Sequence, residues 1–226
     1  MIDGPAHRRG TALAAILGSL LLSAWPAAAQ QPAPLPPGSP LIGQPNTEAA
    51  KKLAPVAPPP LQLYFTENSR DWLSEDIPQD KLNRVTQPGK DNFGYPYCHQ
   101  GNVPDPEFGW GHSCDEFTKP VALLGPHVAP LGMRFYTGTS FPAAYRNQII
   151  VARHGSWNRT KKAGGDLSLV TLNPDGTFKS MEPFVTGFLE DNKYLARPVD
   201  VLVMKDGSLL FSDDYNGAVY RVSHGK

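Results

Sequence analysis

The stretch "RPVDVLVMKDGSLLFSDDYNGAVYRVS", residues 197–223, decides the expected fold. It contains three short runs that are rich in valine, leucine and aromatic residues. The pairs Asp206-Gly207 and Asn216-Gly217 separate these runs, and such pairs favour the tight turns of β-hairpins. We therefore expect strands at 198–204, 208–214 and 217–223, joined as an antiparallel meander.

Further strand-like runs lie upstream, at 61–66, 132–138, 147–154, 166–173 and 177–184. Residues 70–130 carry Pro and Gly at short intervals and are expected to be mostly loop, and no amphipathic helix is found. The chain is thus predicted to be all-β. Its last meander looks like one blade of a β-propeller, although any antiparallel meander shares the pattern.

The number of residues limits how many propeller blades the chain can form. Propeller repeats run to about 40–45 residues and closed rings need about four to eight blades. Residues 61–226 supply about three or four blades, fewer once the loop region is discounted. We expect a partial β-propeller with long loops. Its open edges would need another chain to complete the ring, for example in a homodimer.

The N-terminus predicts export. The 226-residue chain begins with positive charge in "HRRG", an apolar run in "TALAAILGSLLLSAW" and small residues at 27–29, the three parts of a signal peptide spanning 1–29. The alternative, an uncleaved membrane anchor, is disfavoured because the run is shorter than the roughly 20 residues a spanning helix needs. The mature protein is expected in the periplasm or outside the cell, with no transmembrane segment.

Composition narrows the class of partner. The formal net charge is zero, and nucleic-acid binding requires a concentrated excess of Lys and Arg, so a nucleic-acid partner is not expected. Residues 30–60 are rich in Pro and Ala and read as an extended linker, which leaves residues 61–226 as the folded domain. A linker of this kind is more often passive than a binding element.

The two cysteines, Cys98 and Cys114, lie in one loop-like region. In an oxidising compartment we expect them to form a disulfide that stabilises the fold by about 3 kcal/mol on the chain-entropy account. Metal binding by the pair is the weaker reading, because neither cysteine belongs to a C-x-x-C motif.

Four segments together resemble the glucose/sorbosone dehydrogenase family, and its sorbosone-dehydrogenase-like branch most closely. They are "LYFTENSRDWLSEDIPQDKLNRVTQPGKDNFGYPYC", "GPHVAPLGMRFYTGTSFP", "VARHGSWNR" and "RPVDVLVMKDGSLLFSDDYNGAVYRVS". The resemblance implies a six-bladed β-propeller that oxidises a sugar or sugar aldehyde by hydride transfer to pyrroloquinoline quinone (PQQ), with a calcium ion beside the quinone. The electron acceptor is left open.

The resemblance also implies site residues. His127 falls where the family contacts the quinone, His154 stands in the place of a cofactor-binding lysine, and Arg197 matches an arginine that pairs with a PQQ carboxylate. Ser69 and Arg70 match the turn whose backbone carbonyls bind calcium, although this chain departs from the common Gly-Pro there. Without the resemblance, both histidines would read as structural loop residues.

The family places its histidine base in blades that precede the "YFTEN" strand, and none of the six histidines here has the matching context. We therefore expect this chain to lack the N-terminal half of the propeller and to be weakly active or inactive alone. Two alternatives are an exported, catalytically silent binding module and a calcium-dependent lactonase-like propeller. The lactonase would use Glu67, Asn68 and Asp200 as metal ligands.

Overall fold

A computed structural model describes residues 62–71 and 73–225, which lie within one compact unit, Ala57–Lys226. The predicted signal peptide, residues 1–29, and the predicted linker, residues 30–60, lie outside the described residues. Among the residues that are described, no helix is long and apolar enough to cross a membrane.

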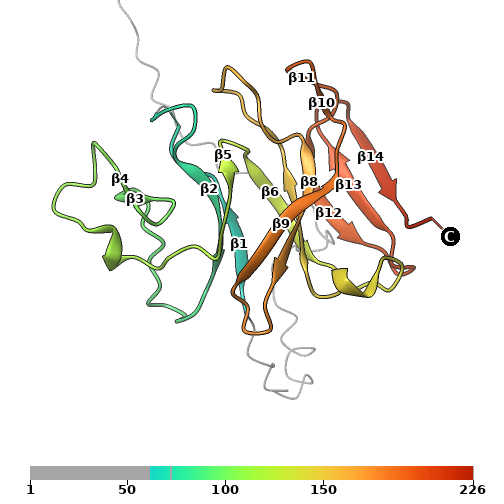
Figure 1. Cartoon of the computed structure of the whole chain (residues 1–226), viewed down its shortest axis with the longest axis horizontal. Coiled ribbons are helices and arrows are strands. Elements are labelled where there is room, and N and C mark those ends of the chain that lie inside the picture. The colour runs from blue at the N-terminus through green and yellow to red at the C-terminus, as the bar shows by residue number, and fades with distance from the viewer. Residues whose placement is uncertain (1–61, 72, 226) are drawn as a thin grey trace, which may run out of the picture. The chain divides into compact units, whose positions relative to one another are not determined.

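The described part is all-β, as predicted, with single 3₁₀ turns at Cys114–Glu116 and Ala143–Tyr145 in addition. Three sheets follow one another in Figure 1. The first has the order β1 (Tyr64–Glu67), β2 (Gln79–Arg84), β5 (Ala122–Pro126). The second has β6 (Pro130–Phe135), β7 (Ile149–Arg153), β8 (Asp166–Leu172), β9 (Phe178–Val185), and the third β12 (Pro198–Val203), β13 (Leu209–Asp213), β14 (Ala218–Val222). Two short hairpins pair β3 (Cys98–His99) with β4 (Val103–Pro104) and β10 (Leu189–Glu190) with β11 (Lys193–Tyr194).

The eight strands predicted from hydropathy are present, but the expectation of mostly loop over 70–130 missed β2, β5 and the short β3–β4 hairpin. Strand β2 buries Asp80, Lys81 and Asn83 beside the single apolar residue Leu82, so hydropathy could not reveal it. Lys81 Nζ lies 2.8 Å from Glu67 Oε1, and Asn83 Nδ2 donates to Glu67 Oε2 at 2.7 Å, which lets these side chains be buried. The number of blades stays a prediction.

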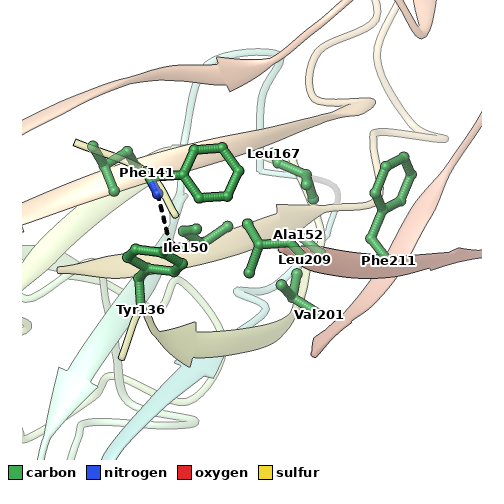
Figure 2. Packing of buried hydrophobic residues seen from close by; sticks show 9 residues of the cluster. Tyr136, Phe141, Ile150, Ala152, Leu167, Val201, Leu209 and Phe211 are labelled. Atoms are coloured by element: carbon green, nitrogen blue, oxygen red, sulfur yellow. Dashed lines mark hydrogen bonds between the residues drawn. The ribbon is translucent and has the colours of Figure 1, made fainter. Parts of the chain in front are cut away.

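The second sheet lies between the other two, and β7 at its centre contributes to both hydrophobic clusters. Because side chains alternate across a strand, Ile149 and Val151 point to one face of β7, whereas Ile150 and Ala152 point to the other. The first pair packs against Leu82 and neighbours in the first sheet. The second pair packs against the third sheet; Figure 2 shows this cluster, which comprises Tyr136, Phe141, Ile150, Ala152, Leu167, Leu169, Val201, Leu209 and Phe211.

Strands β1, β6 and β12, the first strand of each of the three sheets, run in directions that their contacts define. Thr66 Oγ1 donates to Leu131 O at 2.6 Å and the rings of Tyr64 and Phe135 meet edge to face, so β1 runs antiparallel to β6. Gly132 meets Asp200 and Arg134 Nε donates to Val201 O at 3.0 Å, so the contacts follow the same order along β6 and β12 and these two strands run parallel. The turns β1–β2, β5–β6, β7–β8, β11–β12 and β13–β14 consequently gather at one end, the upper end in Figure 1.

Candidate functional site

Hydrogen bonds at this upper end link the positions that the family resemblance singled out. Arg197 Nε donates to the carbonyl of His154 at 3.2 Å, and the His154 backbone N–H donates to the carbonyl of Ala129 at 3.0 Å. The N–H of Ala129 and the N–H of Ser69 donate to the two oxygens of Asp80, at 2.8 and 2.7 Å. Segments more than 120 residues apart in sequence therefore meet in one hydrogen-bonded chain.

Asp80 joins the turn that carries Ser69 to the turn that carries His127. Its side chain is 2% exposed, and burial raises its pKa to about 6, although the two backbone N–H bonds partly oppose that shift. Asp80 was not among the residues predicted for the site. It stands in the polar run "PQDKLN", which carries no signal of a buried strand.

Arg197 is held against the β7–β8 turn by two of the three nitrogens of its guanidinium. Its Nη2 donates to Gly155 O at 2.8 Å, and its guanidinium lies 4.9 Å from the ring centroid of Tyr194. Nη1 has no hydrogen-bond partner among the residues that the structure describes. Lys162 Nζ lies 5.2 Å from the same ring, so two cations share one aromatic side chain. Lys162 was not predicted, because "RTKK" looks like an ordinary solvated run.

Both histidines expected at the cofactor are held by protein groups. His154 Nε2 lies 2.8 Å from Asp214 Oδ1. His127 is buried, has a positive φ of 54° and donates from Nε2 to Ser74 O at 2.7 Å. Its Nδ1 lies 3.4 Å from Asn158 Nδ2, which fits a tautomer with the proton on Nε2 and an accepting Nδ1. The surrounding turns thus fix the orientation of each ring.

The turn expected to bind calcium offers the backbone carbonyls of Ser69 and Arg70. The carbonyls of Ser69 and Arg70 accept no hydrogen bond from any described residue. Their side chains are occupied, since Ser69 Oγ donates to Gln79 O at 2.8 Å and Arg70 binds Asp105. Within residues 62–71 and 73–225, no group of three or more His, Cys, Asp or Glu could hold a metal ion. A calcium ion at this turn would depend on carbonyl oxygens.

Two of the ligands expected for a lactonase already have protein partners. Glu67 is engaged by Lys81 and Asn83 in the first sheet. Asp200 lies on β12, 4.0 Å from Arg134 Nη2. The lactonase alternative stays a prediction.

The long loop 85–121 is stabilised by the predicted disulfide, which is present between Cys98 and Cys114 with a Cα–Cα distance of 5.5 Å. Asp105 organises the same loop. Arg70 Nη1 lies 2.8 Å from both of its oxygens, and His99 Nε2 lies 2.7 Å from Oδ2. Burial alone would raise the pKa of Asp105, but the hydrogen bonds from His99, Arg70 and two backbone N–H groups outweigh it and hold this pKa well below its ordinary value.

Solved structures share this fold. A calcium structure of a Trichoderma reesei carbohydrate-active enzyme of family AA12 matches with a TM-score of 0.60 and 22% identity, over 71% of this chain and 48% of that one. The holo form of the PQQ domain of pyranose dehydrogenase from Coprinopsis cinerea matches with a TM-score of 0.55 and 21% identity, over 72% and 51%. The described domain thus shares the fold of about half of each of these two structures.

Sequence similarity shows the family to which the chain belongs. The family model TrAA12-like matches residues 62–225, and the chain belongs to that family. It is 30% identical over 123 residues to the PQQ-dependent pyranose dehydrogenase of Coprinopsis cinerea, covering 45% of this chain and 16% of that protein. It is 38% identical over 172 residues to an uncharacterized protein of Borreliella burgdorferi, covering 73% and 44%. The chain spans less than half of the length of these curated relatives.

Proposed function

We propose that this chain takes part in the PQQ-dependent oxidation of a sugar or sugar aldehyde, of the sorbosone or glucose type. One observation carries the proposal: two cations, Arg197 and Lys162, converge on Tyr194 at the end of the sheets where the predicted cofactor residues meet. A quinone with three carboxylates needs such cations to hold it. Membership of the TrAA12-like family supports the same reading.

The residues present fit the cofactor. Arg197 would bind a carboxylate through the nitrogen that no described residue engages, and Lys162 would supply a second positive charge. His127 and His154 would contact the quinone from fixed orientations. The carbonyls of Ser69 and Arg70, to which no described residue donates a hydrogen bond, would bind calcium. When bound, PQQ supplies a two-electron acceptor for the hydride of the sugar carbon that is oxidised.

The proposal includes the cellular site and the activity level. Export to the periplasm or the exterior follows from the sequence pattern of residues 1–29. We propose weak or no turnover by this chain alone, because none of its six histidines stands in the context that the family resemblance gives to the histidine base. An assay with PQQ, calcium and an artificial electron acceptor on sorbosone and glucose tests this, and robust turnover would contradict it.

Cofactor binding is tested separately by titrating PQQ into the calcium-loaded protein and following the quinone absorbance. We expect Arg197→Ala to weaken PQQ binding by about 10- to 100-fold, because one charge-assisted hydrogen bond is worth roughly 1.5–3 kcal/mol. The matched control is Arg221→Ala, which removes an exposed arginine paired with Asp206. Equal affinities for the two variants would contradict the assignment of Arg197.

A homodimer is a second proposal, supported by the outer face of the third sheet. Leu202 and Val219 are 53% and 67% exposed there, beside a pocket of about 220 Å³ that Leu210 and Phe211 help to line. Pairing two copies would cover this apolar surface. Light scattering is expected to give a dimer for the natural chain and a monomer for Val219→Lys. A monodisperse monomer of the natural chain would contradict the dimer.

A further inference from the structure

A second pocket lies beside the calcium turn and shares none of His127, His154, Lys162 or Arg197. Its volume is about 350 Å³, enough for a small ligand. It is lined by the turn 68–71 and, from the disulfide-linked loop, by Tyr95, Pro96, His99, Asp105 and Phe108.

Two aromatic side chains on this loop are unusually exposed for their size. Tyr95 is 68% exposed and Phe108 is 48% exposed, and both line the pocket. The loop that presents them is held in place, because Cys98 is bonded to Cys114 and the Phe108 N–H donates to Asp105 at 2.8 Å. A rigid aromatic ring offers an apolar face at little cost in conformational entropy, which suits the C–H face of a sugar ring.

The charges select against an anionic ligand. Arg70 is the cation of this pocket, and it is already paired with Asp105 and Glu107, at 2.8 and 2.9 Å. Asp71 adds a further carboxylate, so negative charge is in excess. A quinone with three carboxylates would be repelled, whereas neutral hydroxyl groups can donate hydrogen bonds to carboxylates and accept them from a guanidinium.

His99 provides an independent sign of an incomplete polar site. Its side chain is 1% exposed and lines the pocket, and Nε2 is held by Asp105. Its Nδ1 is buried and has no hydrogen-bond partner among the described residues. A buried polar atom left without a partner costs about 1–3 kcal/mol, so a ligand or water that reaches it would be stabilised.

We propose that this pocket binds a neutral pyranose, with the sugar ring against Tyr95 and Phe108 and its hydroxyl groups hydrogen-bonded to Asp71 and Arg70. The choice of a sugar rests on the proposed function, but the pocket itself does not require the quinone. It would hold a sugar ring next to the turn that carries Ser69, and so beside the cofactor site.

The test uses the full chain without PQQ and with calcium chelated. D-Glucose is titrated into it, and binding is followed by saturation-transfer NMR and calorimetry. We expect Tyr95→Ala and Phe108→Ala each to weaken glucose binding by about 2- to 12-fold, since an aromatic contact is worth roughly 0.5–1.5 kcal/mol beyond the area it buries. Phe178→Ala, which removes a half-exposed ring from β9, is the matched control and should leave the affinity unchanged.

Each other outcome overturns the proposal: no glucose binding by the natural chain, equal affinity in the Tyr95, Phe108 and Phe178 variants, or gluconate binding as tightly as glucose. Unchanged unfolding midpoints show that the variants fold, as expected for exposed side chains. If PQQ binds but glucose does not, the pocket proposal fails and the proposed function stands. If glucose binding depends on Tyr95 but PQQ does not bind, the pocket proposal stands and the proposed function fails.

Discussion

Asp80 shows what a single buried carboxylate does in this domain. It accepts hydrogen bonds from the N–H groups of Ser69 and Ala129, and so fixes two turns of the candidate site relative to each other. The arrangement has an electrostatic cost, because burial raises its pKa from an ordinary 3.8 to about 6. The folded protein therefore binds a proton more tightly than the unfolded chain does between these two values.

The free energy of unfolding should consequently decrease as the pH rises from about 4 to about 6, and level off above that. A shift from 3.8 to about 6 corresponds to about 3 kcal/mol at most. Asp80→Asn cannot ionise, so we expect this decrease to be lost in urea unfolding measured across that range. Asp115→Asn, at a side chain that is 90% exposed, should retain the decrease.

Equal pH profiles for natural and Asp80→Asn protein would contradict this account. Groups with lowered pKa values, Asp105 above all, act with the opposite sign. They stabilise the folded state above the ordinary carboxyl pKa, and their contribution is lost as the pH falls below about 4. The difference between the natural protein and Asp80→Asn in the window from 4 to 6 therefore isolates Asp80.

At the scale of elements, the second and third sheets meet where β6 and β12 approach most closely. Both strands have an irregular register there, β6 between Pro130 and Met133 and β12 between Pro198 and Val201. Such bulges bend a strand and increase its twist. Gly132 lies at the contact, and an added Cβ would stand 2.6 Å from the Cα of Asp200. The close approach of β6 and β12 therefore requires a residue without a Cβ at position 132.

Gly132→Ala should therefore push β6 away from β12, because the atom it meets belongs to the backbone and cannot rotate aside. We expect a loss of about 1–3 kcal/mol in the free energy of unfolding, measured in urea. Gly225→Ala is the control, since a Cβ there would meet nothing within 4 Å. A Gly132→Ala variant as stable as that control would show that the two strands are not in contact.

At the scale of the whole described domain, the middle sheet connects the two hydrophobic clusters. Ile149 belongs to the cluster with the first sheet and Ile150 to the cluster with the third, although they are neighbours on β7. Any loss of order in β7 must disturb both clusters. The three sheets are therefore expected to unfold together.

We expect Ile149→Ala and Ile150→Ala each to lower the free energy of unfolding by roughly 2–5 kcal/mol, the range for large-to-small changes in a core. Each variant should keep a single cooperative transition when circular dichroism and fluorescence are compared. Ile77→Ala, at a residue that is 40% exposed, should have a much smaller effect. Two separate transitions in either core variant would mean that the sheets unfold independently.

How far the fold could be predicted depended on how each strand is buried. Strands β12, β13 and β14 alternate apolar residues and are bounded by Asp-Gly and Asn-Gly turns, so local pattern was sufficient. Strand β2 was missed because Glu67, from a neighbouring strand, satisfies its buried Lys81 and Asn83. That compensation is a tertiary fact, and no local rule reveals it.

The candidate site follows the same division. Motif resemblance identified Ser69, Arg70, His127, His154 and Arg197, whose roles toward a cofactor stay predictions. Lys162 and Asp80 were missed, because a lysine in a polar run and an aspartate in a loop-like run are both common on surfaces. Only the folded chain shows that Lys162 lies over the ring of Tyr194 and that Asp80 joins two turns.

The sequence by itself determined the all-β class, the strands with alternating hydropathy, the cysteine pairing and the family. These depend on local periodicity, on turn chemistry and on motifs that are contiguous in the chain. The tertiary structure decided which polar residues are buried, which turns meet at one end, and which cations share an aromatic ring. Those features depend on contacts between distant segments, and the free energy of burying a polar group is set by the partner it meets there.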